Sequence, residues 1–173
     1  METIRDQINI LLNGRDLRSI GGSNDVIALI HNQEDFDLLF SYLYNHNRVM
    51  VMRAVDAIEK ISRQHRSYLD KHKSSLLGLI ADAKDKELKW HLAQLVSRLK
   101  LNDDEKNKVF EILKQWVLNQ KESKIVRVNS IQALYEISDN SELLGESFDE
   151  ILNVVKEENI PSINARIKQL KAR

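Results

Sequence analysis

The hydrophobic pattern of residues 50–61 (MVMRAVDAIEKI) recurs three times further along the chain. It returns in residues 88–99 and 126–137, then in shorter form from Ile163, so the four starts lie 38, 38 and 37 residues apart. A fixed period of this length is typical of stacked helical repeats. Apolar or small residues occupy positions 1, 5, 8, 9 and 12 of the first three stretches, and these positions fall on one face of a helix. Each stretch is therefore predicted to be the second helix of a helix pair.

An amphipathic segment precedes each of these stretches, so the chain is predicted to be an all-α superhelix of about four helix pairs behind an N-terminal pair. Few helix breakers, one Pro and five Gly, support helices nearly throughout. We expect a single domain with N-terminal helices in 1–31 and repeats at about 32–64, 65–101, 102–139 and 140–173. In the N-terminal part, helices are expected at 3–13 and 25–32. In the second repeat, a longer helix is expected at 67–83.

The predicted core stripe contains Met50, Ala54, Ala57, Ile58 and Ile61 in the first stretch and their counterparts in the others. Its alanines would allow helices to approach closely. In the last stretch position 9 is Lys171, as expected for a terminal repeat whose outer face meets water.

Polar residues lie on the opposite face of the second helices and form the candidate binding stripe. With the bordering side chains, this stripe consists of Arg53, Asp56, Trp90, His91, Gln94, Arg127, Asn129, Gln132 and Arg166. One interpretation is a solvated helix face, which every amphipathic helix requires. The other is a concave binding surface for an acidic or polar partner, since solenoids bind along such surfaces.

The residues of the third stretch resemble the second helix of HEAT repeats. The resemblance lies in Ile125-Val126-Arg127 followed by Ala133-Leu134 and Ile137. More closely, residues 15–21 (RDLRSIG), 52–62, 88–99 and 125–134 resemble bacterial HEAT-repeat proteins of uncharacterised function. The resemblance covers about residue 15 to the end and implies the fold, but it carries no activity and no site residues.

One position departs from the HEAT pattern, which favours Arg at position 2 of the second helix. The outer repeats have Val51 and Asn164 there, so a ladder of cations is expected only at Lys89 and Arg127.

Trp90-His91 is the most distinctive dipeptide of the chain. Trp90 borders the polar face and could stack on a partner, or it packs between repeats with His91 at the surface. A single His without a nucleophile or carboxylate nearby in sequence is a weak catalytic signal. No catalytic residues are predicted, and a non-enzymatic role is favoured.

The loop before residue 25 is a candidate anion-binding site. It offers Arg15, Arg18, Ser19, Gly21, Gly22 and Ser23 ahead of a predicted helix N-terminus. Two arginines and free backbone N–H groups would suit a phosphate. The alternative is a plain turn with a capping Ser, and no Lys-Ser/Thr follows the glycines as a nucleotide-binding P-loop requires.

The amino-acid composition disfavours several classes of binding function. The chain has 26 Lys+Arg and 26 Asp+Glu, and this balance disfavours general affinity for nucleic acid or anionic membranes. There is no Cys, the five His lie in different elements, and no metal or cofactor is predicted. No apolar run is long enough to span a bilayer, so a cytoplasmic protein is expected.

The favoured function is a non-catalytic scaffold or adaptor that binds a protein or peptide on its concave face. Two alternatives stay open. One is a nucleic-acid-binding protein of the HEAT-like DNA-repair type, with Trp90 and Asp56 in its groove. The other is a small phosphate-bearing ligand at the loop of residues 15–24.

Overall fold

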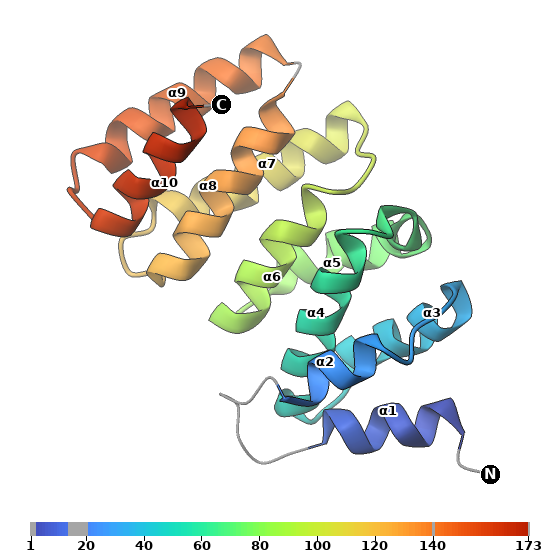
Figure 1. The fold of residues 1–173 in the computed structure, drawn as a ribbon. Coiled ribbons are helices and arrows are strands. Elements are labelled where there is room, and N and C mark those ends of the chain that lie inside the picture. Colours follow the sequence, from blue (N-terminus) through green and yellow to red (C-terminus); the bar gives the residue numbers. More distant parts are fainter. Residues whose placement is uncertain (1–2, 14–20, 140, 173) are drawn as a thin grey trace. The chain divides into compact units, whose positions relative to one another are not determined.

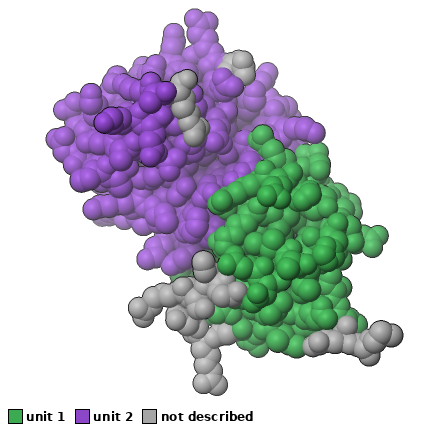
Figure 2. Space-filling model, viewed as in Figure 1, with its two compact units in different colours: residues 1–72 green, residues 73–173 purple. Residues whose placement is uncertain are grey.

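The computed structural model describes residues 3–13, 21–139 and 141–172. These residues form ten α-helices and two 3₁₀ helices, with no strand among them (Figure 1). The all-α fold expected from the repeat period is confirmed. The contacts group into two compact units, Met1–His72 (unit 1) and Lys73–Arg173 (unit 2), shown in different colours in Figure 2. The sequence pattern does not predict this division, and a single continuous domain stays a prediction.

Unit 1 is built around one buried helix. Its elements are α1 (Ile4–Leu12), α2 (Gly21–Ile27), α3 (Gln33–Ser41), η1 (Tyr42–Tyr44), α4 (Arg48–Ser62) and η2 (Arg66–His72). Helices α1, α2 and α3 all contact α4. Twelve of the 15 residues of α4 are buried, including the whole predicted core stripe of residues 50–61.

Unit 2 consists of three helix pairs. Its helices are α5 (Lys73–Asp82), α6 (Lys86–Val96), α7 (Asp103–Leu118), α8 (Lys124–Ser138), α9 (Glu142–Lys156) and α10 (Pro161–Lys171). The second helices α6, α8 and α10 contact one another in order, and the first helices α5, α7 and α9 do the same (Figure 1). The core lies between these two layers, where the predicted apolar positions are buried apart from the half-buried Leu88. Lys171 is exposed, as the terminal-repeat pattern predicts.

Polar caps fix where most helices begin. Asn32, Asn47, Ser123 and Ser141 each accept a backbone N–H from the first turn of the helix that follows. Asn102 and Glu105 form a reciprocal capping box at the start of α7. Such caps satisfy donors that have no partner inside the helix, so they define the repeat boundaries.

Two predicted elements differ from the structure. The N-terminal helix expected at 25–32 is α2, which begins at Gly21 and ends at Ile27. The helix expected at 67–83 begins as the 3₁₀ segment η2 and continues as α5. In both cases the hydrophobic pattern predicts that a helix is present but does not predict the residue at which the α-helix begins.

Gly22 lies where α2 packs against α1. A Cβ atom at residue 22 would lie 1.8 Å from the carbonyl oxygen of Leu11 in α1. Only a residue without a side chain allows the backbones of α1 and α2 to approach this closely. Gly22 thus serves helix packing.

Candidate functional site

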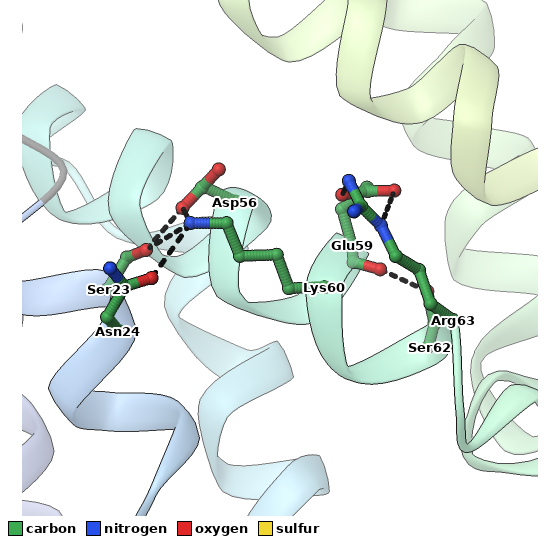
Figure 3. A network of polar contacts seen from close by, with 7 residues as sticks. All are labelled: Ser23, Asn24, Asp56, Glu59, Lys60, Ser62 and Arg63. Atoms are coloured by element: carbon green, nitrogen blue, oxygen red, sulfur yellow. Dashed lines mark hydrogen bonds and ion pairs between the residues drawn. The ribbon is translucent and has the colours of Figure 1, made fainter.

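A partly buried polar cluster joins α2 to α4 (Figure 3). The ammonium of Lys60 lies 2.8 Å from the Asp56 carboxylate and donates to the Asn24 side chain at 3.0 Å. Ser23 donates its hydroxyl hydrogen to Asp56. A serine beside a lysine is one arrangement used for nucleophilic catalysis, but there the lysine must give up its proton. Here the Ser23 hydroxyl is 0% exposed and bonded to Asp56, so this cluster holds two helices together.

A second polar group lies one turn further along α4, also seen in Figure 3. Glu59 is 2% exposed and receives two hydrogen bonds from the Arg63 guanidinium, at 3.0 and 2.7 Å. Ser62 donates its hydroxyl to the Glu59 carbonyl at 2.9 Å. A buried carboxylate needs such charge-assisted bonds, because desolvation alone would make it unfavourable.

Arg53 occupies the polar side of α4 without facing solvent. Its guanidinium donates to the carbonyl oxygens of Leu12 and Asn13, at 3.3 and 2.9 Å, and Arg53 is 9% exposed. These carbonyls end α1, where the helix dipole favours a cation. In unit 1 the structure therefore places Arg53 and Asp56 of the predicted binding stripe in helix–helix contacts. Because both side chains are buried, the interpretation of a solvated helix face is wrong at these two residues.

Unit 2 contains the cation ladder that the second helices predict. Lys89 of α6 pairs at 2.6 Å with Glu122 in the turn after α7, and Arg127 of α8 pairs at 2.7 Å with Glu158 in the turn after α9. Both pairs link one helix pair to the next. Arg127 also donates to the Val117 carbonyl at 2.7 Å and is 1% exposed, which sets it apart from the stripe residues that solvent reaches.

The carboxylates of this ladder titrate below their usual range. The hydrogen bond from Arg127 lowers the pKa of Glu158. Burial acts to raise the pKa of Glu122, but the hydrogen bonds from Lys89 and the Ser123 backbone outweigh it and the pKa is lowered. Both acids are thus held in the charged form that the ion pairs need.

The remaining stripe residues gather on the second-helix layer of unit 2. We call this set, Trp90 and Gln94 of α6, Asn129 and Gln132 of α8 and Arg166 of α10, the amide face; all five are half-buried. Arg166 donates to the Gln132 side chain at 2.7 Å, which joins α10 to α8. Gln132 also donates to Glu136 at 2.8 Å. The face is therefore continuous across two neighbouring helices.

Trp90 and His91 are brought together. Their rings stack with centroids 3.4 Å apart, and His91 is 4% exposed with its Nδ1 2.7 Å from the Glu87 carbonyl. The surface histidine expected by one interpretation is therefore buried, and the half-buried Trp90 covers it. Only the indole of this pair can reach a partner.

Only part of the candidate anion loop lies within the described residues. Arg15, Arg18 and Ser19 lie outside the described residues. Gly21, Gly22 and Ser23 belong to α2, and the Ser23 hydroxyl is bonded to Asp56. Gly22 is required for packing. Neither Gly22 nor Ser23 is therefore available to hold a phosphate.

The described part of the chain contains neither a candidate metal site nor a candidate membrane-spanning helix. Among its residues, no group of three or more His, Asp or Glu side chains could hold a metal ion. None of its helices is long and apolar enough to cross a membrane.

The repeated helix pairs, the stacked layers and the cross-repeat ion pairs define a helical-repeat protein. The chain matches the HEAT repeat domain family over residues 15–173, and it belongs to this family. No curated protein and no solved structure matched the chain in the same comparisons.

The hydrophobic pattern does not reveal which polar positions are buried. It leaves out Glu59, Glu122 and Glu158, the partners within α4 and across the repeats. Glu122 and Glu158 lie 33 and 31 residues after their cations, one repeat away, so a search for acids at that spacing could have found them.

Proposed function

We propose that this HEAT-repeat chain is a scaffold that binds a protein or peptide partner at the amide face of unit 2. The observation that supports it is the set of half-buried amides on the contacting helices α6 and α8, with Arg166 of α10 bonded to Gln132. The corresponding side of α4 in unit 1 is used up by contacts within that unit.

The chemistry of the face fits an uncharged or weakly charged peptide in an extended conformation. Each amide side chain offers both a donor and an acceptor, as a peptide backbone does. Trp90 adds a half-buried aromatic surface of the kind enriched at interfaces. Arg166 and the nearby Glu136 supply one charge of each sign, whereas nucleic acid requires several cations to neutralise phosphates.

Binding would exchange bonds rather than fill vacant ones. Asn129 donates to the Ile125 carbonyl at 2.8 Å, and Gln132 is bonded to both Arg166 and Glu136. A partner must replace these contacts, so the net gain per hydrogen bond is about 0.5–1.5 kcal/mol. Affinity therefore depends on several amides acting together along the face.

The test is a selection of peptides from a random display library on the full chain, followed by affinity measurement. We expect the double variant Gln94→Ala/Gln132→Ala to weaken selected peptides by about tenfold, from two lost hydrogen bonds. The matched control is Gln115→Ala/Asn153→Ala, which removes two exposed amides from α7 and α9 in the other layer. Equal affinities for both double variants would refute this binding face.

A further inference from the structure

A groove lies between the first helices α5 and α7 of unit 2. Its volume is about 820 Å³. Ile80 and Val109 form a buried floor, and Leu77 and Ile112 are half-buried along its walls. This groove is in the layer that does not carry the amide face. A concave, mainly apolar space of roughly 300–1,000 Å³ is the usual form of a small-molecule site.

Gly78 leaves the α5 wall of the groove open. A Cβ atom at residue 78 would meet nothing within 4 Å. The glycine therefore has no packing role of the kind Gly22 has, and it costs α5 about 1 kcal/mol relative to alanine. A larger side chain at this position would project from the lining into open space, which gives a direct way to fill the groove.

The two carboxylates of the groove lining each have a lysine nearby, and the lining contains one further lysine. Glu105 receives the Lys73 ammonium at 2.8 Å, and Glu111 lies 3.7 Å from Lys114. Lys108 is exposed on the lining. It forms no ion pair or hydrogen bond within the part of the chain that the structure describes, and its charge adds to the hydrogen bond from Lys73 in lowering the pKa of Glu105. An apolar floor with one such ammonium at its edge is complementary to a molecule with an apolar body and a single negative group.

We propose that this groove binds a small amphiphilic anion, with an aliphatic chain on the apolar floor and a carboxylate at Lys108. The groove lining extends over residues 105–112 of α7, about 10 Å of helix, and over residues 77–81 of α5, about 6 Å, so an extended aliphatic chain can lie along it. The polar contact fixes the orientation of the ligand and the apolar burial supplies most of its affinity.

The experiment compares three amphiphiles with the same ten-carbon chain on the full protein: decanoate, decanol and decyltrimethylammonium. Binding is measured by calorimetry and by chemical-shift changes below micelle-forming concentrations. Decanoate is expected to bind most tightly. Lys108→Gln should weaken decanoate about threefold, as an exposed ion pair allows, and leave decanol unchanged. Lys106→Gln, which changes a lysine of α7 outside the lining, is the matched control.

Filling the groove provides an independent arm. Gly78→Leu should abolish binding of decanoate and decanol, and Gly145→Leu, at a glycine of α9 that also meets nothing within 4 Å, should leave it intact. Circular dichroism verifies that both variants are folded. Equal binding of decyltrimethylammonium and decanoate, unchanged binding to Gly78→Leu, or no binding of decanoate would each overturn the proposal. Peptide binding at the amide face is measured separately, so either proposal can fail alone.

Discussion

Helices α4 and α8 are both second helices of a repeat, but they use their polar positions differently. Arg53 and Asp56 of α4 are 9% exposed and contact α1 and α2. Asn129 and Gln132, at the equivalent positions of α8, are half-buried and bonded to their own helix or to α10. Position in the repeat therefore fixes which side of the helix a residue occupies. It does not fix whether that side meets solvent.

The difference arises from the residue types and from the helices that reach them. Charged side chains can be buried only when they are paired, and α1 supplies carbonyls while α2 supplies Ser23 for this purpose. Neutral amides need fewer fixed partners and can stay at a surface. A polar stripe in a repeat protein is thus a candidate binding site only where its charges are not already used for packing.

The largest effect is expected at the buried cation of the ladder in unit 2. Arg127→Met leaves the half-buried Glu158 carboxylate without its cation and with only the hydrogen bond from Gln120, which should cost about 3 kcal/mol of the free energy of unfolding. Trp90 and Trp116 both lie in unit 2, so the urea midpoint by tryptophan fluorescence reports this loss. The double variant Arg127→Met/Glu158→Leu should recover most of it. A single variant as stable as the parent would show that this ion pair contributes nothing net.

Close helix packing in unit 1 should give the next largest effect. Gly22→Ala places a Cβ against the Leu11 backbone and should destabilise the chain by about 2 kcal/mol through overpacking. Gly78→Ala, where the new Cβ meets nothing, should instead stabilise it by up to about 1 kcal/mol. Thermal unfolding followed by far-UV circular dichroism measures both. Equal shifts for the two variants would mean that α1 and α2 do not approach as closely as described.

The equivalent residues Arg53 and Asn129 test the comparison directly. Arg53→Ala removes two charge-assisted bonds to the end of α1 and should cost about 1.5 kcal/mol or more. Asn129→Ala, at a half-buried site with one local bond, should change stability by at most about 0.5 kcal/mol. Urea unfolding monitored by circular dichroism compares them. If both cost the same, repeat position rather than burial determines the role.

Much of the fold can be predicted because hydrophobic periodicity records burial directly. The repeat period predicts the second helix of each pair, and Asn102 followed by Glu105 predicts where α7 begins. The candidate site is harder to predict, because a polar residue looks the same in sequence whether it pairs internally or faces water. Arg53 and Arg127 match the pattern of surface residues, since their partners, a helix end and an acid one repeat away, follow no short motif. Gln132 lies on the expected face, where its amide is bonded to Glu136 and Arg166.

The smallest expected effect concerns pH and the carboxylate of Asp37 in α3, which is not part of the candidate binding stripe. Burial acts to raise its pKa, but hydrogen bonds from Lys71, Gln33 and His72 outweigh it and lower the pKa from 3.8 to about 2. Because the folded pKa is the lower one, the stabilisation is complete above the unfolded value and is lost as the pH falls from about 4 towards 2.

Asp37→Asn should therefore destabilise the chain by about 1 kcal/mol at pH 6, after allowance for solvent screening. About half of that difference should remain at pH 3, because the unfolded carboxylate is by then mostly protonated and the folded one mostly is not. The urea midpoints of both proteins at the two pH values measure it. Asp82→Asn, which changes an exposed acid of α5, controls for net charge. A penalty for Asp37→Asn that is the same at pH 6 and pH 3 would show that loss of an acceptor oxygen, and not loss of the charge, is what destabilises unit 1.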